Sequence, residues 1–123
     1  MLEREAMNSV FHDAAHLDIF GDVHGQRHAL CKALTALGYE ELTGVWRHPR
    51  GRRAIFVGDL IDRGPDSRGV LRIVRAMVEN GEAACILGNH ELNAVHFATQ
   101  HPEMEHQFLR PRSDKNLLQH IHF

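Results

Sequence analysis

The stretch RAIFVGDLIDRG, residues 53–64, decides the fold of this chain. Its first half, residues 53–57, contains the apolar run Ala54 to Val57, of the kind that forms a buried β-strand. Asp59 follows where that strand is expected to end, and Asp62 and Arg63 then lie on a polar loop. Taken alone, Asp62 and Arg63 would also fit a surface ion pair in a turn. A strand that ends on Gly-Asp therefore needs a second observation before it indicates a site.

Two other stretches provide that observation, because they repeat the same arrangement. Residues 17–20 form a short apolar run that leads into GDVHG, residues 21–25. Residues 83–87 form another, which leads into GNHE, residues 88–91. In open α/β sheets, ligands bind outside the carboxyl ends of the strands. Three polar motifs at three strand ends therefore predict a single shared site.

The side chains of these motifs are suited to a divalent metal ion. Asp22 and His24 are two residues apart, so in extended backbone they point to the same side and can chelate one ion. Asn89 offers a neutral oxygen ligand, and the adjacent His90 can donate a proton. Each motif alone also fits a polar strand end or a helix cap. Together they are what two divalent ions about 3.5–4 Å apart would need.

The remaining pattern predicts an α/β layered domain with a partly parallel sheet. Helical spacing of apolar residues, with flanking Gly and Pro, predicts helices over residues 26–37, from Pro65 to Gly81, and over residues 91–99. Val45-Trp46 and residues 53–57 flank a turn-rich stretch, which suggests a hairpin between them. The segment from Asn116 to Phe123 is expected to begin one more helix, which the chain end cuts off.

Composition limits the classes of function. With 123 residues the chain suits one small domain, and its 43% hydrophobic and 24% charged residues are ordinary for a soluble protein. A net charge of -2 gives no support for a nucleic-acid partner or a membrane surface, and no apolar run approaches a membrane span. The N-terminus lacks the apolar middle of a signal peptide, so a cytoplasmic location is expected. Cys31 and Cys85 are expected to be buried, reduced thiols. Among the 11 histidines, five have no partner at a ligand-like spacing and are given no role: His12, His16, His28, His48 and His106.

The motifs GDVHG, GDLIDRG and GNHE, in this order, resemble the signature of the calcineurin-like metallophosphoesterases. More narrowly, they are similar to the phosphoprotein-phosphatase branch, which includes bacterial serine/threonine phosphatases and symmetrical diadenosine tetraphosphatases. The resemblance covers Leu17 to about Asn93. It implies an α/β metallophosphoesterase fold. Residues 1–123 would be a single, C-terminally incomplete domain that supplies the first half of a layered α/β sandwich.

The resemblance also implies a metal-ligand set. Asp22 and His24 would bind the first metal, Asp59 would bridge both metals, and Asn89 would bind the second. Two divalent ions, with manganese or iron expected, would activate a water for in-line attack on phosphorus. The implied activity is the hydrolysis of a phosphate ester.

Three further residues have catalytic roles by the same resemblance. His90 would protonate the leaving alcohol, and Asp62 would hold the imidazole in a useful orientation. Arg63 would clamp phosphate oxygens with its planar fork of donors.

The chain departs from the family pattern in two places. Many phosphoprotein phosphatases have an arginine where this chain has Leu87, which puts in doubt an ion pair with Glu91. The family also supplies two more histidine ligands for the second metal, and another arginine, from a second half of the fold. His120 and His122 are not expected to replace those ligands, because they lie in a predicted helix start. A basic group after residue 102 is expected to be a solvated loop: Arg110, Arg112 and Lys115.

These departures leave several hypotheses open. The substrate could be a phosphoprotein, a dinucleoside polyphosphate or a small ester. The chain could also be a truncated or inactive homologue that binds metal or phosphate without turnover, or a dimer that completes the site in trans. A sheet with one uncovered apolar face further predicts self-association.

Overall fold

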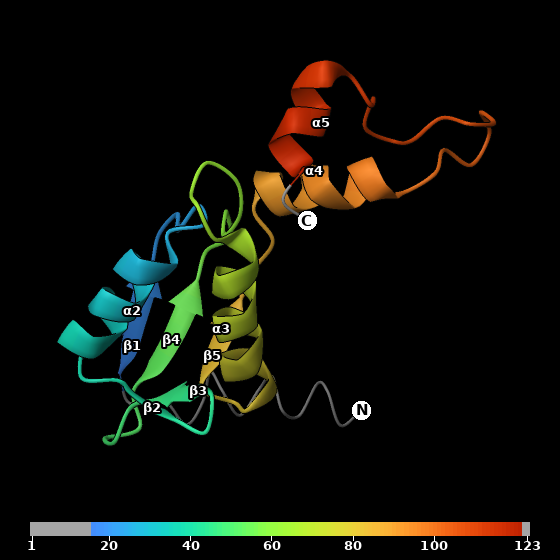
Figure 1. The fold of residues 1–123 in the computed structure, drawn as a ribbon. Coiled ribbons are helices and arrows are strands. Elements are labelled where there is room, and N and C mark those ends of the chain that lie inside the picture. The colour runs from blue at the N-terminus through green and yellow to red at the C-terminus, as the bar shows by residue number, and fades with distance from the viewer. Residues whose placement is uncertain (1–15, 122–123) are drawn as a thin grey trace, which may run out of the picture.

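The computed structural model describes residues 16–121, and Figure 1 shows their arrangement. The elements follow one another as β1 (Leu17–Phe20), α2 (Arg27–Ala36), β2 (Glu40–Leu42), β3 (Val45–Arg47), β4 (Arg53–Phe56), α3 (Ser67–Glu79), β5 (Ala83–Cys85), α4 (Asn89–Ala98) and α5 (Asp114–His120). The predicted alternation of strands and helices is therefore confirmed, with one additional strand, β2.

Strands β1, β4 and β5 form a parallel sheet in the order β1-β4-β5. Both crossovers step in the same direction along the sheet. Because parallel crossovers are right-handed, α2 and α3 must then cover the same face. Figure 1 shows both helices in front of the sheet. The carboxyl ends of all three strands lie at one edge, as expected for a shared site.

The hydrophobic core lies between this face of the sheet and the two helices. Leu34 of α2 and Val70 of α3 are fully buried there, against Phe56 of the central strand. The rings of Phe20 and Phe56 stack with their centroids 4.9 Å apart. Each such side chain contributes about 1.5–3 kcal/mol when buried. The core thereby fixes the strand ends relative to one another.

The opposite face of the sheet is uncovered by the described residues. Ile19 of β1 is 72% exposed, and Leu17 beside it is also exposed. The expectation of a buried β1 is therefore right for only one of its faces. Cys85 of β5 is a free but exposed thiol, which corrects the expected burial, whereas Cys31 is free and half-buried. The prediction of an uncovered apolar sheet face is confirmed for this part of the chain.

The predicted hairpin is wrong in its partner. Strand β3 pairs antiparallel with β2, with Trp46 opposite Glu41. The turn between them, Thr43-Gly44, has φ of 52° and 82°, the left-handed values that a tight two-residue hairpin turn requires. The stretch expected to pair with β3 is β4, whose two edges are already bonded to β1 and β5.

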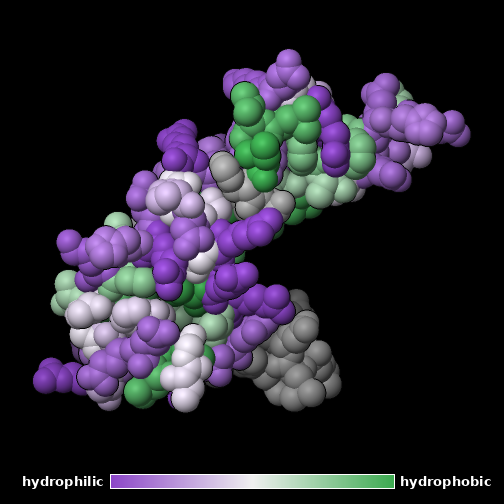
Figure 2. Space-filling view, viewed as in Figure 1, coloured by the Kyte–Doolittle hydropathy of each residue, from purple (hydrophilic) through white to green (hydrophobic). Residues whose placement is uncertain are grey.

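Helices α4 and α5 form an arm beyond the carboxyl edge of the sheet, as Figure 1 shows. Helix α5 begins at Asp114 and ends at His120, so the predicted start at Asn116 is two residues late. The predicted extension to Phe123 lies outside the described residues. Figure 2 shows apolar side chains gathered on this arm, where Leu118 and Ile121 are strongly exposed. Among residues 16–121, no helix is long and apolar enough to cross a membrane.

Candidate metal centre

Backbone hydrogen bonds hold the loops after β1 and β4 together. The amide of His24 donates to the Asp59 carbonyl at 2.9 Å, and that of Gly25 donates to Leu60 at 2.7 Å. The backbones also approach closely at two glycines. A methyl group on Gly64 would collide with the His24 carbonyl, and one on Gly58 would collide with the backbone at Gly88. The glycines of the three motifs therefore let their loops pack main chain against main chain.

Asp22, His24 and Asp59 converge at this edge of the sheet. One ligand atom from each lies within 4.8 Å of the others. The Nδ1 atom of His24 is 2.9 Å from the Ile61 carbonyl oxygen, which can only accept, so Nδ1 carries the proton. In the neutral ring this leaves the lone pair on Nε2, which lies 3.7 Å from an Asp22 carboxylate oxygen. Two carboxylates and one neutral imidazole are a donor set that fits a divalent cation.

Asn89 lies directly beside this cluster. One terminal atom of its carboxamide is 3.1 Å from both carboxylate oxygens of Asp59. Turned with its nitrogen toward Asp59, the amide donates to both oxygens. If the amide oxygen of Asn89 faces Asp59 instead, oxygen atoms of the two side chains lie against one another. A cation between them would stabilise that arrangement. The residues present therefore fit a second cation next to Asp59, with only these two ligands from the described residues.

Glu91 fastens the loop after β4 to the start of α4. Its buried carboxylate accepts hydrogen bonds from three backbone amides, those of Asp59, Leu60 and Gly88. The Gly88 bond is half of a capping box, because glycine has no side chain to return the other half. Leu87, at the position of the family's arginine, is 70% exposed. Backbone donors thus satisfy the Glu91 carboxylate in this part of the chain without an arginine.

His90 and Asp62 form a pair next to the metal cluster. His90 Nδ1 lies 2.7 Å from Asp62 Oδ2, so the ring donates from Nδ1 to the carboxylate and its Nε2 stays available. The rings of His90 and His24 meet edge to face, with centroids 4.7 Å apart. Both partners are largely buried, and Asp62 is 6% exposed. The structure thus brings together the two residues expected to cooperate in proton transfer.

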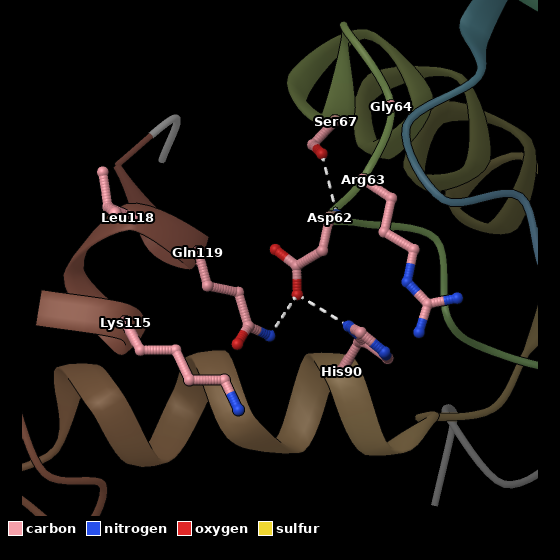
Figure 3. Close-up of a pocket in the computed structure, with 8 residues that line it drawn as sticks. All are labelled: Asp62, Arg63, Gly64, Ser67, His90, Lys115, Leu118 and Gln119. Carbon is pink, nitrogen blue, oxygen red and sulfur yellow. Dashed lines mark hydrogen bonds and ion pairs between the residues drawn. The ribbon is translucent and has the colours of Figure 1, made fainter. Parts of the chain in front are cut away.

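Arg63 lines a cavity of about 530 Å³ beside this pair. Figure 3 shows its side chain extending alongside His90. Lys115 and Gln119 of α5 line the same cavity from the other side. The cavity therefore has a cation on each side and the His90–Asp62 pair between them.

Several site residues adopt backbone conformations that L-amino acids rarely adopt. His24, Asp59, Asp62 and Arg63 have φ of 43°, 51°, 69° and 67°. Such left-handed conformations cost about 1 kcal/mol or more for a residue other than glycine. The loop hydrogen bonds and the Glu91 anchor hold them in place. The strain is concentrated in the loops that carry the expected ligands.

The basic group after residue 102 is exposed at Arg112 and Lys115, as expected from sequence, but it is not a simple loop. Arg112 packs its guanidinium over the Phe97 and Phe108 rings, 4.5 and 3.7 Å from their centroids. Arg110 is half-buried, and Lys115 belongs to α5. Gln119 was given no role from the sequence, but its amide nitrogen donates to Asp62 Oδ2 at 2.8 Å. No motif marks that residue.

His120 is not one of the three residues whose ligand atoms lie within 4.8 Å of one another. It is buried against Phe97, with ring centroids 4.7 Å apart. Burial lowers its pKa, although the nearby Asp62 carboxylate opposes the shift. His122 lies outside the described residues. That His120 is not a metal ligand stays a prediction.

Comparisons with known proteins place these loops in a family. The curated relatives include proteins named bis(5'-nucleosyl)-tetraphosphatase PrpE (asymmetrical). One from Halalkalibacterium halodurans is 49% identical over 73 residues, which cover 59% of this chain and 30% of that protein. One from Oceanobacillus iheyensis is 45% identical over 74 residues, covering 60% of this chain and 30% of that protein. The chain therefore spans about a third of the length of these relatives. The sequence profile of the calcineurin-like phosphoesterases matches residues 15–122, a range that contains all three loops. On this match, the chain belongs to the calcineurin-like phosphoesterase family.

Proposed function

We propose that this chain provides the metal-binding and proton-donating part of a hydrolase that cleaves phosphate esters or phosphoanhydrides. The observation that carries the proposal is the convergence of Asp22, His24 and Asp59 next to the His90–Asp62 pair. The family implies divalent metal ions, and the donor set fits them. We expect manganese or iron, and the mixed oxygen and nitrogen ligands do not by themselves single out one metal.

In this proposal, Asp22 and His24 hold one ion, Asp59 is shared, and Asn89 holds the second. Divalent ions held by these residues would supply Lewis-acid chemistry toward phosphoryl oxygens and would activate water. We assign the remaining steps to side chains of this protein. They bind the phosphate, orient the proton donor and deliver the proton.

Proton transfer is assigned to His90. Its Nδ1–H bond to Asp62 fixes the ring and leaves Nε2 to give a proton to the oxygen of the leaving group. The Asp62 carboxylate stabilises the imidazolium before the transfer. Arg63, exposed at the cavity wall, would bind two equatorial oxygens of the phosphate in a bidentate manner.

Dinucleoside polyphosphates are the substrate class that we favour. The relatives named as tetraphosphatases support this choice. A cavity with Arg63 on one side and Lys115 on the other also suits a chain of phosphates better than a single one. A phosphoprotein or small ester would need only the phosphate at the metal centre.

The second candidate is a metal-binding chain without turnover. It is favoured by the ligand count at the second position, where only Asp59 and Asn89 are available among residues 16–121. Affinity there would be weak unless further ligands are supplied by another segment or by a second copy of the chain.

The test is manganese-dependent release of nucleotide from diadenosine tetraphosphate by the purified chain, with a chromogenic phosphate monoester in parallel. The comparison variants are His90→Asn and His96→Asn. His96 lies on the same helix, α4, and is half-buried outside the cavity, so its variant controls for helix stability. Metal-dependent activity that collapses in His90→Asn but persists in His96→Asn supports a working hydrolase. Equal rates in both variants and the wild type would contradict the role of His90. Metal binding without any hydrolysis would favour the second candidate.

A further inference from the structure

Helix α5 reaches the His90–Asp62 pair through one side chain. Gln119 Nε2 donates to Asp62 Oδ2 at 2.8 Å, across 57 residues of sequence. The same oxygen accepts the Nδ1–H of His90 at 2.7 Å. Figure 3 shows both bonds meeting at this carboxylate, from opposite sides. Asp62 therefore joins α4 to α5 through a single atom.

Arg110 fixes the orientation of the Gln119 amide. Arg110 Nη2 donates to Gln119 Oε1 at 3.1 Å. A guanidinium can only donate, so the amide oxygen must face Arg110 and the amide nitrogen must face Asp62. The result is a chain of hydrogen bonds that runs from Arg110 through Gln119 and Asp62 to His90.

The chain of hydrogen bonds restricts the rotation of the Asp62 carboxylate. A carboxylate bonded to one imidazole can rotate and offer either oxygen. The other oxygen, Oδ1, is buried and has no hydrogen-bond partner among the described residues. With two donors on Oδ2, a partial rotation of the carboxylate would weaken both bonds at once. Gln119 thereby selects the rotamer in which Asp62 holds the His90 ring.

We infer that Gln119 is a positioning residue for the proton donor, and that α5 is a functional part of the site. The inference rests on the proposed function for its kinetic consequence, but the hydrogen-bond chain itself can be tested without turnover. Outer partners of this kind change activity about 10- to 100-fold when they are removed. The effect belongs in kcat, because Gln119 orients a group that acts in the transition state.

The kinetic test uses the 123-residue chain and the substrate on which it is active. Gln119→Leu removes the donor at similar volume and is expected to lower kcat about tenfold, with KM within about twofold. Gln119→Glu replaces the donor by an acceptor that faces Asp62, so it should lower kcat further. Asn116→Ala is the matched control on α5, because within residues 16–121 its side chain bonds only to the Pro111 carbonyl, outside the cavity. A kcat for Gln119→Leu within twofold of the wild type would overturn the inference.

A double-variant cycle separates positioning from simple support of the helix. If Gln119 acts through Asp62, adding Gln119→Leu to Asp62→Ala should lower kcat no further. A full tenfold additional loss in the Asp62→Ala background would overturn the inference, since the effect would then bypass Asp62.

The spectroscopic test remains valid if the chain hydrolyses no substrate. That result would contradict the proposed function but not this inference. Long-range ¹H–¹⁵N spectra of the imidazole rings report the hydrogen bond at His90 Nδ1. Gln119→Leu should shift the His90 nitrogens and Asn116→Ala should leave them in place. Unchanged His90 signals in Gln119→Leu would overturn the inference, whatever the activity.

Discussion

Replacing Glu91 by glutamine should destabilise the chain by about 2–3 kcal/mol, although it changes only one atom of the side chain. The Glu91 carboxylate accepts three backbone N–H groups. Glutamine keeps one oxygen, which can still serve Asp59 and Gly88. Its NH₂ group would face the Leu60 amide, donor against donor. One charge-assisted bond is lost, and a buried N–H is left without an acceptor.

This loss is large beside the 5–15 kcal/mol of a typical domain. It should lower the melting temperature by about 8–12 °C, at roughly 4 °C for each kcal/mol. Trp46 is the single tryptophan and is buried, so its fluorescence can follow urea unfolding. The midpoint should fall while the slope of the transition stays the same.

The matched control is Glu79→Gln on α3. Glu79 pairs with Arg75 one helical turn away, and both side chains are exposed. The same chemical change at this position should leave the midpoint unchanged, because exposed pairs contribute little. If Glu91→Gln shifts the midpoint no more than Glu79→Gln does, the three backbone bonds do not anchor the loop, and the explanation given for Glu91 is wrong.

Three further outcomes are expected. Asp59→Asn should weaken manganese binding at least about tenfold, because it removes the shared carboxylate; isothermal titration with equal affinity for both proteins would contradict the ligand assignment. The Arg52 guanidinium holds the pKa of Asp18 below its usual range. The stability from this pair is therefore full above about pH 4 and is lost as the pH falls through the lowered pKa. Urea midpoints should thus fall more steeply in the wild type than in Asp18→Asn below that pH, and parallel curves would refute this. Ile19→Lys and Ile86→Lys, on exposed apolar positions, should reduce self-association in sedimentation runs, and unchanged association would place the contact elsewhere.

The three strand-end motifs could be located from sequence because their signals are local. An apolar run of four or five residues that closes on Gly-Asp or Gly-Asn marks both the strand and its end. Parallel neighbours then bring these ends together, so the convergence of Asp22, His24 and Asp59 followed from the element order. The roles of these residues in catalysis stay predictions.

The sequence predicted the wrong partner for β3 because the residues of β2 have almost no strand pattern. Glu40, Glu41 and Leu42 are all exposed, and two of them are charged. Pairing of β3 depends instead on the left-handed turn at Thr43-Gly44 and on competition for β4. Such competition is decided by tertiary packing and leaves no mark on a short window of sequence.

The contribution of α5 could not be foreseen for a related reason. Gln119 lies in an ordinary amphipathic segment, 57 residues from its partner Asp62. The burial of Cys85 was misjudged because both crossover helices lie on the same side of the sheet, which strand patterns do not reveal.

The left-handed residues of the site have a consequence for laboratory evolution. Glycine adopts the φ values of Asp59, Asp62 and Arg63 without a steric penalty, so each replacement by glycine would relieve about 1 kcal/mol of strain. A library of this chain that is sorted only by heat resistance should therefore enrich glycine at an exposed position such as Arg63. Its most heat-resistant members would then lack the side chain that we propose binds phosphate. Selection for thermal stability and selection for activity therefore favour different residues at the same positions, so a screen of such a library should measure both.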